Sequence, residues 1–308
     1  MLRVLFDEEA TSAALTLPDD ISVDAIANGP AYVMTIISIL AILAVAIILT
    51  AYIIRKHGFS GFGLLLGIGV YVLFFAMAGL QVANLLLYAL PKAATDNDLI
   101  KSLVAALCIS VMSIGGRILS MFLFKNKLSN IKDSAGFGMG IMIAEAASLM
   151  LNFFMYVIFY RTLNEEGFGY YIENLTSQSD LDTQVEMFLV TGGEHFVSLL
   201  VGLSVMLIDL SMSTVMLAAF KSKINPAKGY GICLGGYFVV ELFIYLASFE
   251  TVPRAIEAVV AVVLAGAMVL YGLRMYHFHF KQDEEDEKEA KKKAETKKMP
   301  RYKNLSNM

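Results

Sequence analysis

The sequence predicts an all-α protein, a polytopic membrane helix bundle of about seven transmembrane helices. Hydrophobic residues make up 57% of the 308-residue chain and charged residues only 17%, whereas soluble domains average about 25% charged. The apolar residues are gathered in blocks of about 20 residues or more, the length that a helix needs to cross a bilayer core. None of the blocks alternates as the strands of a membrane barrel do, so helices are the remaining way to span.

The blocks contain few charges and divide the chain into three parts. The first two blocks carry no charge, and the next four each carry one charged residue in their interior. We expect an acidic extracytoplasmic segment over residues 1–30, a seven-helix membrane domain over 31–280 and a charged cytoplasmic tail over 281–308. The blocks are residues 31–54, 61–90, 103–124, 136–160, 194–220, 230–248 and 254–278.

The distribution of Lys and Arg predicts the orientation. One alternate set of loops, together with the tail and the end of the last block, contains 18 Lys and Arg residues, and the other set contains 5. Under the positive-inside rule, the N-terminus lies outside and the C-terminus in the cytoplasm. We expect a plasma membrane, and specifically a bacterial inner membrane. The net charge is −4 and no basic domain is present, so the expected partner is the lipid bilayer and not a nucleic acid.

Three segments outside the blocks carry weaker patterns. Residues 17–27 are either a short amphipathic helix or disordered, and residues 181–190 are expected to form a short helix at the membrane surface. Residues 281–308 contain an acidic block followed by a basic block. This tail is either a patch that binds anionic lipid or a solvated segment that enforces the topology.

Four charged residues lie deep within the blocks, away from their ends: Arg117, Glu145, Asp209 and Glu241. At about 1.5 Å per residue, the first three lie in one layer, about 10–16 Å from the basic edge. An unpaired arginine at that depth is costly, so Arg117 is expected to pair with Glu145 or Asp209. The pair is either a packing salt bridge, or it leaves one carboxylate, together with Glu241, to bind a proton, a metal or a substrate.

A metal site has little support in the sequence. None of the four histidines lies in the layer of Glu145, and neither an HExxH motif nor a CxxC pair is present. We therefore assign no metal ligand. The neighbouring Glu194 and His195 are interpreted as a polar cap at the membrane surface, and the glycines of segments 61–69, 115–117 and 136–140 as sites where helices approach closely.

The order of these pieces resembles the YhfC family of intramembrane peptidases, which is related to the CAAX-prenyl peptidases. The resemblance is carried by four segments that lie between residues 60 and 250. They are "GIGVYVLFFAMAGLQVANLLLYAL" (67–90), "SIGGRILSMFLFKN" (113–126), "GFGMGIMIAEAASL" (136–149) and "GGEHFVSLLVGLSVML" (192–207).

The resemblance implies an intramembrane peptidase scaffold in which Glu145, Glu194 and Arg117 are catalytic-site residues. However, Ser113 and Ile114 stand where the family has a glutamate pair, and Met139 and Gly202 where it has histidines. The resemblance therefore implies a degenerate or inactive member that binds or acts on membrane-protein or peptide substrates, with zinc as cofactor only if the peptidase site survives.

Two other classes remain open on the residues alone. One is a small transporter or proton-coupled permease in which Asp209 and Glu241 form the substrate or proton path. The other is a structural membrane partner subunit whose charged residues pair off completely.

Overall fold

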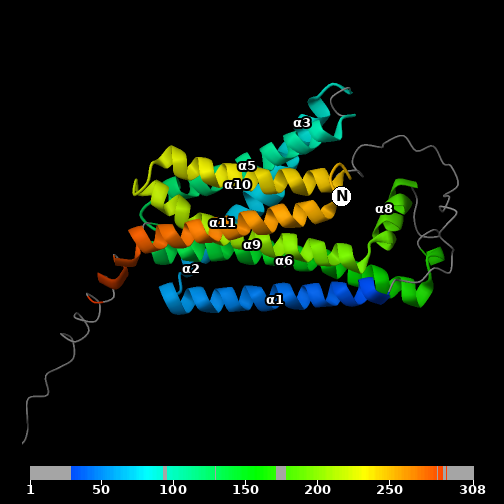
Figure 1. The fold of residues 1–308 in the computed structure, drawn as a ribbon, viewed down its shortest axis with the longest axis horizontal. Coiled ribbons are helices and arrows are strands. Elements are labelled where there is room, and N and C mark those ends of the chain that lie inside the picture. Colours follow the sequence, from blue (N-terminus) through cyan, green and yellow to red (C-terminus); the bar gives the residue numbers. More distant parts are fainter. Residues whose placement is uncertain are drawn as a thin grey trace, which may run out of the picture.

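The computed structural model describes residues 29–92, 96–128, 130–170, 178–282, 284–286 and 289. All of its regular elements within these residues are helices, and seven helical stretches are long and apolar enough to cross a membrane. The predicted fold class, an all-α polytopic bundle, is confirmed (Figure 1). The elements are α1 (Gly29–His57), α2 (Gly61–Val70), η2 (Tyr71–Gly79), α3 (Leu80–Ala89), α5 (Asp98–Leu123), α6 (Ile131–Glu166), α8 (Gln178–Leu189), α9 (Gly192–Phe220), α10 (Pro226–Ser248) and α11 (Arg254–His279).

Several helices begin at a polar residue that the apolar blocks did not include. The Asn97 side chain accepts hydrogen bonds from two backbone amides of the first turn of α5, and Asn130 and Asn225 do the same for one amide each in α6 and α10. Such caps satisfy amide groups that have no partner inside the helix. The caps place the helix starts several residues before the apolar blocks begin.

Helices α5, α9 and α11, which are the third, fifth and seventh spans, run in the same direction. At one end, the Phe122 ring of α5 lies 5.5 Å from the Phe220 ring of α9. At the other end, Arg254 at the start of α11 lies 3.9 Å from Glu194 at the start of α9. The Lys- and Arg-rich loops consequently gather at the end of the bundle opposite α8 (Figure 1). Which membrane face this end occupies stays a prediction of the positive-inside rule.

Glycines allow α2 and α6 to pack backbone against backbone. A Cβ atom on Gly67 would collide with the carbonyl oxygen of Phe137, and one on Gly140 would collide with the carbonyl oxygen of Leu64. By contrast, a Cβ on Gly69 would meet nothing within 4 Å. Lipid supplies no hydrophobic driving force for helix association, so helices in a membrane are held together by close van der Waals packing. Small residues at the crossings permit that packing. The predicted role of the glycine segments therefore holds at Gly67 and Gly140 but not at Gly69.

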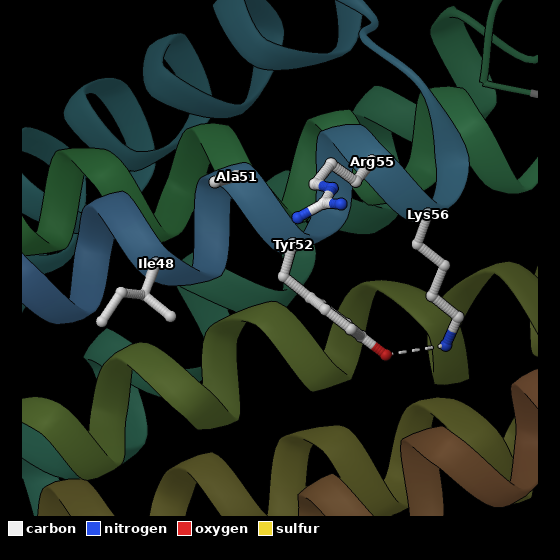
Figure 2. Close-up of a pocket in the computed structure, with 5 residues that line it drawn as sticks. All are labelled: Ile48, Ala51, Tyr52, Arg55 and Lys56. Atoms are coloured by element: carbon white, nitrogen blue, oxygen red, sulfur yellow. Dashed lines mark hydrogen bonds between the residues drawn. The ribbon is translucent and has the colours of Figure 1, made fainter.

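Helix α1 lies at the edge of the bundle, and much of its surface faces outward (Figure 1). Near its basic end, α1 borders a surface hollow of about 520 Å³ (Figure 2). The residues lining the hollow are Ile48, Ala51, Tyr52, Arg55 and Lys56.

Besides these earlier starts, the fourth span differs from the sequence prediction at its far end and the second span differs in its helix type. The fourth extends over Ile131–Glu166, beyond the predicted 136–160, because polar residues continue the helix past its apolar centre. The second contains a π-helical stretch, η2, which a nearly uniform apolar pattern does not signal. The short surface helix expected at 181–190 is present as α8, Gln178–Leu189. Residues 17–27 and most of the tail 281–308 lie outside the described residues.

Candidate functional site

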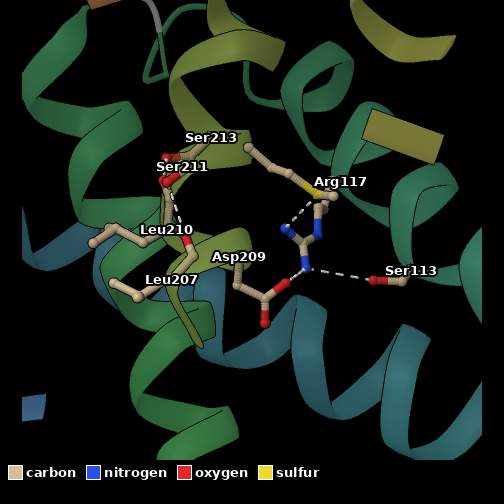
Figure 3. Close-up of polar contacts among 8 residues, drawn as sticks. Ser113, Arg117, Leu207, Asp209, Leu210, Ser211 and Ser213 are labelled. Carbon is tan, nitrogen blue, oxygen red and sulfur yellow. Dashed lines mark hydrogen bonds and ion pairs between the residues drawn. The ribbon is translucent and has the colours of Figure 1, made fainter. Parts of the chain in front are cut away.

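The centre of the candidate site is a buried ion pair between Arg117 of α5 and Asp209 of α9 (Figure 3). Arg117 is 2% exposed and Asp209 is fully buried. The sequence left Glu145 and Asp209 open as partners of Arg117, and in the structure the ion pair is formed with Asp209. The guanidinium also approaches the Ser113 hydroxyl at 3.5 Å and the Met212 sulfur at 3.9 Å. One charged group and two weak acceptors thus surround the arginine.

Helix α10 adds an aromatic ring and a carboxyl group to this layer. The Arg117 guanidinium carbon lies 5.5 Å from the centre of the Tyr237 ring, within the range of a cation–π contact. Glu241 follows Tyr237 by four residues, which places both on one face of α10. Both side chains are buried, and Glu241 interacts electrostatically with Glu145 and Asp209.

Glu145 enters the same layer from α6, and Tyr71 of η2 lies beside it. The Tyr71 side chain is near both Glu145 and Ser148. The position of η2 depends on Gly116, because a Cβ atom there would collide with the Phe74 ring. The glycine that precedes Arg117 thereby lets the π-helical stretch approach α5, and this brings Tyr71 into the layer.

We call Arg117, Glu145, Asp209, Tyr237 and Glu241 the polar cluster. Three of its buried oxygens have no hydrogen-bond partner among the described residues, namely Glu145 Oε2, Asp209 Oδ2 and the Tyr237 hydroxyl. Buried polar atoms are normally paired, because desolvation without a partner costs about 1–3 kcal/mol each. Their concentration in one layer of the membrane domain marks this layer as the candidate site.

The polar cluster contains three carboxyl groups and one guanidinium. Within the described residues, Arg117 is the one cation that forms an ion pair with any of these carboxyl groups, and its partner is Asp209. Full ionisation would leave two negative charges uncompensated in the low-dielectric interior. The cluster is therefore chemically suited to hold protons or a bound cation.

The structure separates Glu194 from the polar cluster. Glu194 lies at the first turn of α9, where it forms a capping box with Thr191: its carboxylate accepts from the Thr191 backbone amide at 2.7 Å. His195 is buried next to it and lies 2.9 Å from the Tyr160 hydroxyl. Tyr160 is fifteen residues beyond Glu145 on α6, about 22 Å along the helix axis. The interpretation of this pair as a polar cap fits the geometry of Glu194.

The polar cluster lacks the histidine and cysteine ligands that a zinc centre prefers. No group of three or more His, Cys, Asp and Glu side chains that could hold a metal ion occurs within the part of the chain that the structure describes. His57 is the last residue of α1, and His277 and His279 lie in the last turn of α11, at the basic end of the bundle, whereas Glu145 lies in the interior of α6. Carboxyl groups without a histidine beside them suit zinc poorly.

Two members of the layer were missed at the level of sequence. Tyr237 carries a signal, because it stands one helical turn before Glu241 and must share its face. Tyr71 carries none, since it is one of many aromatic residues in an uncharged block.

Comparisons with protein-family models, with curated proteins and with solved structures find no match for this chain.

Proposed function

We propose that this multi-pass membrane protein is a small proton-coupled permease in which the polar cluster binds and releases protons. The observation that supports the proposal is the excess of carboxyl groups over cations in a buried layer. Asp209 is held by Arg117, whereas Glu145 and Glu241 have no ion-pair partner among the described residues. Protons on these two groups would remove the cost of uncompensated charge. A group that gains and loses a proton within the membrane is what coupled transport requires.

Infrared spectroscopy of the reconstituted protein tests the proton-binding part of the proposal. A protonated carboxylic acid has a C=O stretching band that is separate from the bands of carboxylates and amides. We expect this band at neutral pH, and we expect Glu241→Gln and Glu145→Gln each to remove part of it. Glu194→Gln, which alters a partly exposed helix cap outside the polar cluster, is the matched control and leaves the band unchanged. Absence of the band in the wild-type protein would contradict proton binding and leave a bound cation as the compensating charge.

Transport further requires that the cluster be reached by water from each side of the membrane in turn. Ser113 is buried beside Arg117 and suits a cysteine probe. In a background where Cys108 and Cys233 are replaced by alanine, we expect Ser113→Cys to react with a membrane-impermeant maleimide added to either side of oriented vesicles. Reaction from neither side would contradict the permease and favour a structural partner subunit.

A second candidate is a YhfC-like scaffold that binds membrane peptides without cutting them. It is favoured by the position of Arg117 and Glu145, the two residues of the resemblance that fall in one layer, and by the close packing of Gly116 on Phe74. Metal analysis of the purified wild type and of Glu145→Gln tests its catalytic form. Stoichiometric zinc that is lost in the variant would support a peptidase. No metal in either protein would contradict a zinc-dependent reaction and leave only the binding role.

A further inference from the structure

The hollow on α1 has an order of side chains that matches a phospholipid (Figure 2). Ile48 and Ala51 form its apolar part, Tyr52 its middle, and Arg55 and Lys56 its basic end. Ile48 and Arg55 are seven residues apart, about 10 Å along the helix axis. This is comparable to the distance from the upper acyl chain of a lipid to its phosphate.

Arg55 is the exposed cation of this hollow. It makes no ion pair or hydrogen bond with the part of the chain that the structure describes, and it is not shielded by a neighbouring helix. A guanidinium presents paired N–H donors that fit the oxygens of a phosphate group. A basic group at the end of a membrane helix is also where anionic lipid head groups are attracted.

Lys56 is held in place beside Arg55 by two aromatic residues. Its ammonium donates a hydrogen bond to the Tyr52 hydroxyl at 3.2 Å and lies 4.2 Å from the centre of the Tyr276 ring of α11. These contacts fix the second positive charge at the rim of the hollow. Glu284 contacts the adjacent His57, so a negative group lies near Lys56, and Arg55 carries the larger part of the attraction for an anion.

The apolar part of the hollow is open to lipid. Ile48 is 65% exposed and Tyr52 is 54% exposed. Tyrosine is common where the hydrocarbon core meets the head groups. The hollow of about 520 Å³ is open and is lined by residues of α1 alone, so a lipid bound there lies along the surface of this helix.

We propose that this hollow is a binding site for an anionic phospholipid, with the phosphate at Arg55 and Lys56 and an acyl chain along Ile48 and Ala51. The site is separate from the polar cluster, and the proposal does not depend on the transport function. Charge complementarity selects an anionic lipid over a zwitterionic one, and the apolar lining selects a lipid over a free phosphate.

Native mass spectrometry of the delipidated full-length protein tests this assignment. Phosphatidylglycerol and phosphatidylcholine with identical acyl chains are added at equal concentrations. Each basic residue near the surface contributes about fivefold in affinity for anionic lipid. The variant Arg55→Gln with Lys56→Gln is therefore expected to bind phosphatidylglycerol about 30-fold more weakly than the wild type. The matched control, Lys125→Gln with Lys127→Gln, removes two exposed cations at the same end of the bundle and is expected to change binding less than twofold.

A third variant separates a shaped site from general attraction to a basic surface. Ala51→Trp keeps both charges but fills the hollow, and we expect it to lower phosphatidylglycerol binding at least fivefold. Circular dichroism and gel filtration confirm that each variant is folded. The proposal is overturned if the two lipids bind equally to the wild type, if the Lys125 and Lys127 control loses as much binding as the double variant, or if Ala51→Trp has no effect. Displacement of the lipid by inorganic phosphate at equal concentration also overturns it.

Discussion

Replacing Asp209 by asparagine should be among the most destabilising single changes in this protein. The substitution keeps the size of the side chain but removes the negative charge that faces Arg117. The arginine is 2% exposed and cannot lose its proton. The other groups that the guanidinium approaches within hydrogen-bonding distance are the Ser113 hydroxyl at 3.5 Å and the Met212 sulfur at 3.9 Å, and neither carries a charge. Breaking a buried ion pair in this way costs about 3–5 kcal/mol.

The reverse substitution, Arg117→Gln, should cost less. A carboxyl group left without its cation can take up a proton, so the Asp209 side chain becomes neutral and the residual cost is that of lost hydrogen bonds, about 1–3 kcal/mol. The double variant, which carries both amides, should be more stable than Asp209→Asn alone because no buried charge is left. Glu145 interacts with Arg117 as well as with Asp209. Adding Glu145→Gln to Asp209→Asn should therefore destabilise further.

Reversible unfolding by SDS in mixed micelles, followed by circular dichroism, gives the free energy of unfolding of each variant. The buried thiols of Cys108 and Cys233 provide a second readout, because a thiol-reactive dye reports when the membrane domain opens. An Asp209→Asn variant as stable as the wild type, or an Arg117→Gln variant less stable than Asp209→Asn, would contradict the expected order. Either result would mean that Arg117 has another negative partner or is reached by water.

Three further predictions concern packing and caps, and each is measured by the same unfolding assay. Gly67→Ala should cost about 1–3 kcal/mol, since the new Cβ meets the backbone of α6, whereas Gly69→Ala, on the same helix but in open space, should be neutral or stabilising. Thr191→Ala should cost about 1 kcal/mol by removing the cap of α9; no change would mean that the helix end is satisfied by solvent. Tyr160→Phe should cost about 1–3 kcal/mol, since it deletes the hydroxyl 2.9 Å from the buried His195 ring; a stable variant would show that water replaces it.

The number and type of the spans followed from composition because a bilayer leaves few alternatives. A chain that crosses a hydrocarbon core must pair its backbone groups internally, so long apolar blocks become helices. The ends of α5, α6 and α10 could not be placed so well. They depend on single capping residues, such as Asn130, that stand outside the apolar pattern.

The candidate site was predicted in part. The four charged residues were identified because a charge within an apolar block is rare and costly, and depth along each helix correctly placed Arg117 and Asp209 in one layer. Glu194 illustrates the limit of this reasoning. The family resemblance made it a catalytic-site residue, but its carboxylate accepts a hydrogen bond from the Thr191 backbone amide at the start of α9. Helix depth alone would have shown that Glu194 lies fifteen residues, about 22 Å along α9, from Asp209 of the polar cluster.

The sequence by itself determined that this is a seven-helix membrane protein with ionisable residues in its interior. Both properties depend on the free energy of transferring each residue from water to lipid, which is set by the type of residue. Only the tertiary structure decided that Arg117 pairs with Asp209 and not with Glu145, that Tyr71 and Tyr237 join the same layer, and that α1 borders a hollow. Those outcomes depend on how each helix is rotated about its axis and how closely it approaches its neighbours. In nearly uniform apolar blocks, rotation and approach are set by small residues such as Gly116 in contact with a particular partner.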